Sequence, residues 1–245
     1  MCTVQKVAIV AALEREIRPL VKIWRLCEQD HAGRRFRFYE SEYAVLTCGG
    51  IGAEPARRAA EAIIALYQPA LIYSAGFAGA LDRKQHIGDI IVPRRVINAN
   101  DGSSIDTGQG EGILVSFASV ASPEQKAKLA YSYSAQAVDM EAAAVARAAE
   151  ARGVRFAAVK AVSDESDFVL PAVDAFIDAE GQFKTTAFAL FTAIRPWTWG
   201  ATLRLKRNSR LASQALCGWI EHVDMSKLLR SEPDVPHALE SLRQR

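Results

Sequence analysis

The 245-residue chain lacks any apolar run of the roughly 18 residues that a membrane-spanning helix requires. Its start, Met1 to Lys6, also lacks the long apolar core of a secretion signal. The four cysteines are scattered, with no Cys-x-x-Cys pair or other metal-ligand spacing: Cys2, Cys27, Cys48 and Cys217. We therefore expect a cytoplasmic protein with reduced thiols and no metal site.

The sequence also has little net charge and no nucleotide-binding glycine fingerprint. Its 30 basic and 28 acidic residues leave a net charge of +2, too small to indicate nucleic-acid binding. Neither Gly-x-Gly-x-x-Gly nor a Walker A sequence occurs, so a nicotinamide-dependent oxidoreductase is a weak alternative. Half of the residues are hydrophobic and 24% are charged, which is typical of a globular protein of one large or two small domains.

What the sequence does contain is an alternation of apolar runs with helical patterns. Val7–Ala12 is apolar throughout, as in a strand buried on both faces. Ala70–Ser74 is predicted as another buried strand, and Phe156–Val162 as a further strand. Helical patterns follow, and helices are predicted over Leu13–Leu26, Glu54–Tyr67 and Asp139–Arg152. This alternation predicts an α/β fold with a mostly parallel or mixed sheet and helices on both faces.

Smaller elements are predicted between these segments. Arg34–Tyr39 and Tyr43–Thr47 suggest a hairpin, and Ser122-Pro123 is a favourable helix start. The remaining predictions are strands at Ile90–Pro93 and Leu114–Ala121, and a loop or short hairpin at Asn98–Gly112.

Ligands of open α/β sheets gather at the carboxyl ends of the strands. In this chain the rule brings together Glu14 and Glu16, two glycine-rich turns at Gly49–Gly52 and Gly76–Gly79, and Ser163-Asp164. Glu141, near the start of its helix, can join them. Such turns suit an anion or a closely approaching ligand, although tight packing of a strand against a helix explains Gly49–Gly52 equally well.

These carboxylates suit cleavage of a C–N bond between a ribose and a base, which passes through an oxocarbenium-like centre. Asp164, at the end of an apolar strand, can donate a proton to the departing base. Glu141 can accept hydrogen bonds from ribose hydroxyls, Met140 can offer a soft apolar surface, and a second carboxylate can orient water. The alternative is that carboxylates at helix starts only favour the helix dipole.

The segment after Asp164 differs in character. An amphipathic helix is predicted over 201–223, with a basic face next to leucines and tryptophans. This pattern suits either a membrane surface or packing against the sheet. We expect one domain over residues 1–230, followed by a polar tail at 231–245.

Five short motifs follow one another along the chain: Ala11–Glu16, Gly50–Gly52, Gly76–Leu81 with Gly88-Asp89, Val138–Ala142, and Ala161–Asp164. Their order and spacing resemble those of the purine nucleoside phosphorylase and nucleosidase superfamily. Within the superfamily the chain is most similar to the methylthioadenosine/S-adenosylhomocysteine nucleosidases. The resemblance implies a phosphorylase/hydrolase-like three-layer sandwich with a central twisted mixed sheet. It also implies an enzyme that cleaves the N-glycosidic bond of a 5′-substituted purine nucleoside, with adenine as the expected base.

The resemblance also implies roles for individual residues. Asp164 would protonate N7 of the purine with Ser163 orienting it, Met140 and Glu141 would hold the ribose hydroxyls, and Glu16 would help to activate water. The base would lie against the segment from Phe117 to Ala121.

One position departs from the family pattern, because Phe77, after Gly76, stands where nucleosidases and many phosphorylases carry serine near the water or phosphate. No arginine has motif support as a phosphate ligand, although Arg18 and Arg57 are candidates. Hydrolysis and phosphorolysis therefore both stay open, with no cofactor expected and inorganic phosphate as a candidate co-substrate. The resemblance further implies a homodimer that binds no nucleic acid.

The segment after Asp164 resembles the hopanoid-associated phosphorylase branch, which is assigned to removing adenine from adenosylhopane. The residues that carry this resemblance are Ser163–Asp167, Leu170-Pro171, Asp178–Gly181, Arg195-Pro196 and the basic helix up to Trp219. Phe77 and the basic helix would suit such an apolar substrate at a membrane surface. A non-catalytic purine-nucleoside binding protein is the alternative from another functional class.

Overall fold

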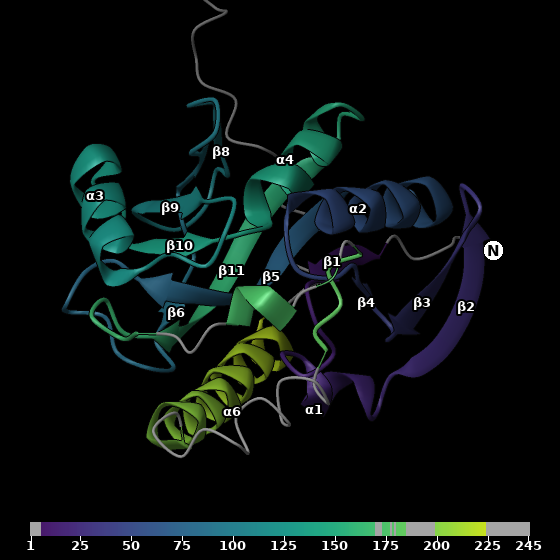
Figure 1. The fold of residues 1–245 in the computed structure, drawn as a ribbon. Helices are drawn as coiled ribbons and strands as arrows, with labels where there is room; N and C mark the ends of the chain where they lie inside the picture. The colour runs from purple at the N-terminus through teal and green to yellow at the C-terminus, as the bar shows by residue number, and fades with distance from the viewer. Residues whose placement is uncertain (1–5, 170–172, 177, 179, 185–198, 224–245) are drawn as a thin grey trace, which may run out of the picture.

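The computed structural model describes residues 6–169, 173–176, 178, 180–184 and 199–223. Figure 1 shows a twisted mixed sheet with helices on both faces, as the sequence predicts. The strands are β1 (Val7–Ala11), β2 (Arg25–His31), β3 (Arg34–Glu40), β4 (Ala44–Cys48), β5 (Leu71–Ala80), β6 (Ile90–Ile91), β7 (Arg95–Asn98), β8 (Ser104–Asp106), β9 (Ile113–Ser116), β10 (Ala137–Asp139) and β11 (Arg155–Asp164). The helices are α1 (Arg18–Val21), α2 (Ala53–Tyr67), α3 (Pro123–Tyr133), α4 (Ala142–Glu150) and α6 (Trp199–His222), with a 3₁₀ turn at Val173–Phe176.

The long strand β5 is the centre of the sheet. It pairs in parallel with β1 along its first part and with β11 from Leu71 to Gly79, and its end pairs antiparallel with β10. The sheet continues outward as β4-β3-β2 beyond β1 and as β9-β7-β8 beyond β10. The carboxyl ends of β1, β5, β10 and β11 thus reach one region of the molecule, where the predicted site residues lie.

Two apolar clusters cover the two faces of the sheet. On one face α2 and α4 pack with alanines, including Ala59, Ala60 and Ala146, which are fully buried and allow close helix approach. On the other face α6 packs Leu216 and other buried residues against the sheet. Figure 1 shows α2 and α4 on the side of the sheet opposite to α6.

The prediction of a helix over Leu13–Leu26 is wrong for most of that segment. Only α1, Arg18–Val21, is helical, and the chain becomes strand β2 at Arg25. Pairing explains the difference, because every residue of β2 lies opposite a residue of β3 in an antiparallel register. The local apolar period cannot reveal this non-local pairing.

Two further boundaries differ from the predictions. The segment Gly76–Gly79, predicted as a turn, continues strand β5 because it pairs with β11 and β10. Helix α4 begins at Ala142 rather than Asp139, because Ala137–Asp139 pairs as β10 with β9. Asp139 therefore belongs to a strand end, and Glu141 stands immediately before the helix.

Several local predictions are confirmed. Strands β3 and β4 form the predicted antiparallel hairpin. Ser122 caps α3 with a complete capping box, in which Ser122 Oγ accepts from Gln125 N and Gln125 Oε1 accepts from Ser122 N. The segment 98–112 contains β8, paired with β7 as a short hairpin.

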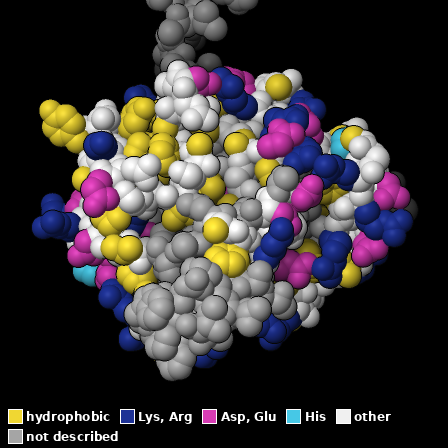
Figure 2. Space-filling model, viewed as in Figure 1, with side chains coloured by type: hydrophobic (Ala, Val, Ile, Leu, Met, Phe, Trp, Pro, Cys, Tyr) yellow, Lys and Arg dark blue, Asp and Glu magenta, His cyan; other side chains and the backbone are white. Residues whose placement is uncertain are grey.

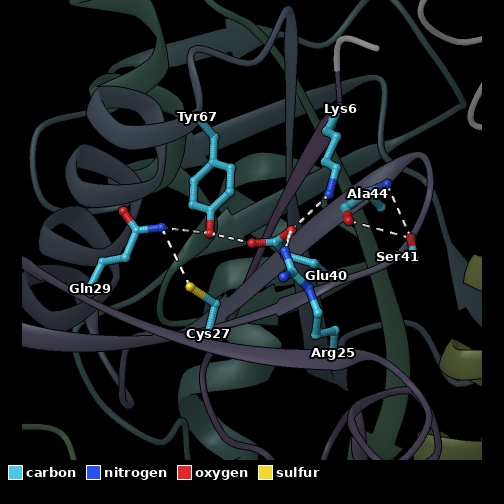
Figure 3. Close-up of polar contacts among 8 residues, drawn as sticks. All are labelled: Lys6, Arg25, Cys27, Gln29, Glu40, Ser41, Ala44 and Tyr67. Carbon is cyan, nitrogen blue, oxygen red and sulfur yellow. Dashed lines mark hydrogen bonds and ion pairs between the residues drawn. The ribbon is translucent and has the colours of Figure 1, made fainter. Parts of the chain in front are cut away.

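A polar cluster around Glu40 joins three parts of the fold. Figure 3 shows its carboxylate receiving hydrogen bonds from Lys6, Arg25 and Tyr67, at 3.0, 2.8 and 2.9 Å. Burial raises the pKa of Glu40, but these three donors outweigh it and lower that pKa to about 2. The cluster therefore holds the end of β3 to β1, β2 and α2.

Helix α6 confirms the predicted amphipathic helix, and its apolar side packs on the sheet. Leu216 is buried, whereas Leu203 and Leu211 are exposed. None of the described helices combines the length and the hydropathy needed to cross a membrane. Leu170-Pro171, Arg195-Pro196 and the tail at 231–245 lie outside the described residues.

Candidate active site

A cavity of about 150 Å³ lies where the carboxyl ends of the central strands meet. Segments far apart in the sequence contribute to it, from the β1–α1 connection to α6. Its described lining is Ala12, Arg15, Glu16, Ile51, Phe77, Ala78, Gly79, Ser119, Val120, Ala121, Lys126, Val138, Asp139, Met140, Glu141, Ser163, Asp164, Phe183, Leu205 and Ser209. The structure thus brings together six of the eight predicted site residues: Glu16, Phe77, Met140, Glu141, Ser163 and Asp164.

A β-bulge at the end of β11 brings Ser163 and Asp164 to the same cavity. Val162 pairs with Ala78 and Asp164 pairs with Gly79, so Ser163 is the extra residue. Successive side chains of a regular strand point to opposite faces, and a bulge interrupts that alternation. Ser163 Oγ donates to Asp164 Oδ1 at 2.7 Å, the arrangement expected of a residue that orients the acid.

Lys126 forms a buried ion pair with Asp164 that the sequence analysis missed. Its Nζ lies 2.5 Å from Asp164 Oδ2 and also donates to the carbonyl of Glu165 at 2.7 Å. The Lys126 side chain is 2% exposed and comes from the first turns of α3. Asp164 is buried as predicted, but its surroundings include the ammonium group of Lys126 and are not apolar alone.

Gly79 leaves the space that this ion pair occupies. A Cβ at that position would lie 2.8 Å from Asp164 Oδ2 and 3.1 Å from Lys126 Cε. Any side chain there would displace the pair. The small residues of β5 were predicted to let a ligand approach the backbone, and at Gly79 the approaching group is the protein's own carboxylate.

Glu141 faces the cavity with one carboxylate oxygen anchored. Gly52 N donates to its Oε1 at 2.8 Å, and Met140 N lies 3.3 Å from its Oε2. Burial raises the pKa of Glu141 to about 7, and the neighbouring carboxylates of Asp139 and Glu16 add to the rise while Lys160 opposes it. Glu141 can therefore exchange a proton near neutral pH.

The glycine-rich turn at Gly49–Gly52 uses its N–H groups within the protein. Gly49 and Gly50 donate to the carbonyls of Ala11 and Ala12, and Ile51 donates to that of Gly181. With Gly52 bonded to Glu141, all four N–H groups have protein acceptors. The turn therefore packs β4 against its neighbours and positions Glu141, which favours the packing interpretation over an anion cradle.

Asp139 and Lys160 form a second buried ion pair, beneath Glu141. Lys160 Nζ lies 2.8 Å from Asp139 Oδ2 and donates to Ser74 Oγ at 3.0 Å. Asp139 also accepts from Ser116 Oγ and from the N–H of Ala142, so it fixes the start of α4. Burial lowers the pKa of Lys160, but the surrounding carboxylates outweigh it and raise that pKa.

Glu16 lines the cavity and lies close to Lys160. A Cβ at Gly76 would lie 3.0 Å from Glu16 Oε2 and 3.7 Å from Lys160 Nζ, so both side chains border this glycine. Glu16 is 5% exposed, and burial raises its pKa against the opposing effects of Arg15 and Lys160. Glu14, in contrast, is exposed and binds Arg37 at 2.6 Å outside this cavity.

Two predicted residues do not line the cavity. Gly76 borders the carboxylate of Glu16 and is not part of the cavity lining. Phe117 packs with the apolar cluster of α3, β9 and β10, while Ser119, Val120 and Ala121 of the same segment do line the cavity. Phe77 presents an aromatic side chain to the cavity where the family pattern has serine.

The residues that sequence reasoning missed are basic. Lys126 and Lys160 lie in a helix and a strand whose local patterns indicate only secondary structure. The candidates Arg18 and Arg57 do not line the cavity, and Arg57 instead binds Glu54 and Glu61 on the exposed side of α2. Within the described part of the chain, no group of three or more His, Cys, Asp or Glu residues is arranged to hold a metal.

Comparison with known proteins identifies the family. A family model described as "Phosphorylase superfamily" matches residues 6–122 and 110–194. The 5′-methylthioadenosine/S-adenosylhomocysteine nucleosidase of Staphylococcus aureus (strain bovine RF122 / ET3-1) is 27% identical over 195 residues, which cover 64% of this chain and 86% of that relative.

Solved structures show the same fold. The 5′-methylthioadenosine/S-adenosylhomocysteine nucleosidase of Neisseria meningitidis, in complex with methylthio-immucillin-A, has a TM-score of 0.69 and 18% identity and covers 91% of this chain and 99% of that chain. The futalosine hydrolase of Helicobacter pylori has a TM-score of 0.63 and 20% identity, with coverage of 90% and 99%. These likenesses confirm the predicted three-layer α/β fold. Because the family model spans well over half of the sequence, the chain belongs to the phosphorylase superfamily, which confirms the predicted membership and with it the prediction of a nucleoside-cleaving enzyme.

Proposed function

We propose that the protein cleaves the N-glycosidic bond of a 5′-substituted purine nucleoside, releasing the base. The observation that carries the proposal is that Asp164, Glu141 and Glu16 line one cavity, although they are far apart in the sequence. A proton donor, a group for the ribose hydroxyls and a carboxylate near the nucleophile are the three parts that this reaction needs. The relatives named nucleosidases and hydrolase support the same reaction class.

The base end of the cavity is at Asp164, Ser163 and Lys126. A departing purine must gain a proton at N7. Asp164 in its protonated form donates that proton and becomes a carboxylate, which the ammonium group of Lys126 then stabilises. Ser163 holds the other carboxylate oxygen. Adenine is the base we propose.

The sugar end is at Glu141, Met140 and Glu16. Each carboxylate oxygen of Glu141 accepts one backbone N–H, from Gly52 or Met140, and can accept a further hydrogen bond from a ribose hydroxyl. Glu16 lines the cavity with Lys160 nearby, and we propose that the nucleophile approaches C1′ beside Glu16. Phe77 reduces the polar groups there, so we propose water as the nucleophile and treat phosphate as the alternative.

A base-release assay tests the proposal. Adenine release would be measured from methylthioadenosine, S-adenosylhomocysteine and an adenosyl-lipid, each with and without inorganic phosphate. We expect release in at least one case, and Asp164→Asn should lower kcat by about 10²- to 10⁴-fold, the usual range for general acid catalysis. If no nucleoside releases a base, the non-catalytic binding function takes its place. An unchanged rate in Asp164→Asn would refute the role of Asp164.

We also propose a cytoplasmic homodimer, following the resemblance. Size-exclusion chromatography with light scattering would test the dimer. An adenosylhopane-type substrate is a weaker alternative, because five arginines line the space next to the sugar end together with its apolar side chains.

A further inference from the structure

A second and larger cavity lies beside the candidate active site. Its volume is about 710 Å³, against about 150 Å³ for the first. Its described lining comes from the β1–α1 connection, β3, the end of β4, α2 and the segment 180–184. Figure 2 shows basic and acidic side chains crowded on the side of the molecule where β2 and β3 lie in Figure 1.

The two cavities meet at three residues, because Ala12, Arg15 and Phe183 line both. The guanidinium of Arg15 lies over the ring of Phe183, 5.0 Å from its centroid. Arg15 precedes Glu16 in the chain, so this junction opens from the sugar end of the smaller cavity.

The larger cavity is basic. Five arginines and two glutamates line it, an excess of three positive charges: Arg15, Arg34, Arg35, Arg37 and Arg58 against Glu14 and Glu180. Arg37 is paired with Glu14 at 2.6 Å, Arg35 with Asp30 at 3.3 Å and Arg58 with Glu54 at 3.6 Å. Neither Arg15 nor Arg34 forms an ion pair with any residue that the structure describes.

The volumes of the two cavities indicate that one ligand extends from the smaller cavity into the larger one. The smaller one falls below the roughly 300 Å³ at which pockets for small ligands usually begin, and the larger one falls inside that range. A purine nucleoside with its base at Asp164 and its hydroxyls at Glu141 has the 5′ carbon left to carry a substituent out of the smaller cavity. That substituent would pass Arg15 and Phe183.

We infer that the larger cavity binds the 5′ substituent of the substrate, and that this substituent carries an anionic group such as a carboxylate or a phosphate. The inference rests on the proposed function. Arginine presents several N–H donors in a planar fork that matches the oxygens of such groups. Of the five arginines that line this cavity, Arg15 and Arg34 are the two without an ion pair to a residue that the structure describes.

Two other occupants fit the cavity less well. An apolar substituent would take the arginines out of water without replacing their hydrogen bonds, which is unfavourable. A free phosphate shares the anionic chemistry, but a single phosphate is much smaller than 710 Å³. The experiment separates these cases.

The test uses two 5′-thioadenosines of equal chain length, one ending in a carboxylate and the other in a neutral hydroxyl. The selectivity is the ratio of kcat/KM for the anionic to the neutral compound. We expect the wild-type protein to prefer the anionic compound by about 10-fold or more, since hydrogen bonds to charged groups have this strength. We also expect the preference to shrink as NaCl is added.

Arg34→Gln should reduce the selectivity toward 1 while the neutral compound keeps its rate. Arg57→Gln is the matched control, because Arg57 lies on α2 outside both cavities and should leave the selectivity unchanged. Melting curves of both variants verify that they are folded.

Each outcome bears on one claim. Equal rates for the two compounds in the wild type would overturn the inference and leave the proposed function intact. If neither compound releases adenine, the proposed function fails first. If Arg34→Gln lowers only the phosphate-stimulated rate on the neutral compound, free phosphate occupies the cavity and the 5′ assignment is overturned.

Discussion

Glu40 and Glu141 are both largely surrounded by protein, yet their surroundings shift their pKa values in opposite directions. Glu40 receives hydrogen bonds from two cations and a phenol, which overcome burial and lower its pKa to about 2. Burial and the neighbouring carboxylates of Asp139 and Glu16 raise the pKa of Glu141 to about 7. The first cluster stabilises the fold, and the second leaves a carboxyl group that can titrate and bind at physiological pH.

In this pair, the carboxylate saturated with side-chain donors stabilises the fold, and the one with only backbone donors is open to a ligand. Three side chains bond to Glu40, as Figure 3 shows. The partners of Glu141 in the structure are two backbone N–H groups, and its remaining surface faces the cavity. Replacing the two carboxylates and the buried lysines one at a time tests this difference, and Lys160 has the largest expected effect.

Removing Lys160 should destabilise the functional cluster most. Lys160→Met leaves Asp139, Glu141 and Glu16 without their shared cation, and breaking a buried pair in this way costs about 3 to 5 kcal/mol. Urea unfolding at pH 7 would measure the loss. Lys160→Arg, which keeps the charge, should lose much less, and equal losses in the two variants would contradict the electrostatic explanation.

Removing the charge of Glu40 should cost stability without affecting catalysis. A shift of its pKa from 4.5 to about 2 corresponds to about 3 kcal/mol of stability, or about 9 °C in Tm. Because the folded pKa is the lower one, this contribution is present above pH 4.5 and is lost as pH falls toward 2. Melting curves of Glu40→Gln should therefore differ most from wild type at neutral pH, with unchanged kcat/KM.

The matching change at Glu141 should have the opposite result. Glu141→Gln should lower kcat/KM by about 100-fold, through loss of a charged acceptor for the ribose hydroxyls. The raised pKa means that wild-type stability falls as pH rises from 4.5 through 7, so the variant should gain relative stability over that interval. A variant with full activity, or with reduced stability at pH 8, would contradict the assigned role.

The smallest predicted effect concerns Lys126, which acts through Asp164. Lys126→Met should lower kcat by about 10-fold with little change in KM, since the lost interaction stabilises the carboxylate formed in the transition state. Lys126→Arg should recover most of the rate. Equal activity in the two variants would indicate that Lys126 only fills space.

The sequence was informative where structure is local. The apolar run at Val7–Ala11, the capping box at Ser122 and the alanine-rich pattern of α2 each determine an element through residues close together in the chain. The motifs also placed Glu16, Glu141, Ser163 and Asp164 in one site.

The remaining parts of the fold and of the site depend on contacts between segments far apart in the chain, so the sequence could not predict them. Strand β2 was missed because its register depends on β3, and the apolar period of Leu13–Leu26 suggests a helix when that pairing is ignored. Lys126 and Lys160 contact carboxylates on other elements, 38 and 21 positions away, and nothing near either lysine in the sequence indicates a partner. The arginine-lined cavity depends likewise on how β3, α2 and the β1–α1 connection come together.

One pH titration tests the central contrast most directly. In protein with ¹³C at the glutamate carboxyl carbons, the resonances of Glu40 and Glu141 would be assigned by their absence in Glu40→Gln and Glu141→Gln. The account predicts that Glu141 titrates near pH 7, whereas Glu40 stays ionised down to about pH 2. Titration of Glu141 at or below 4.5, its ordinary value, would contradict it.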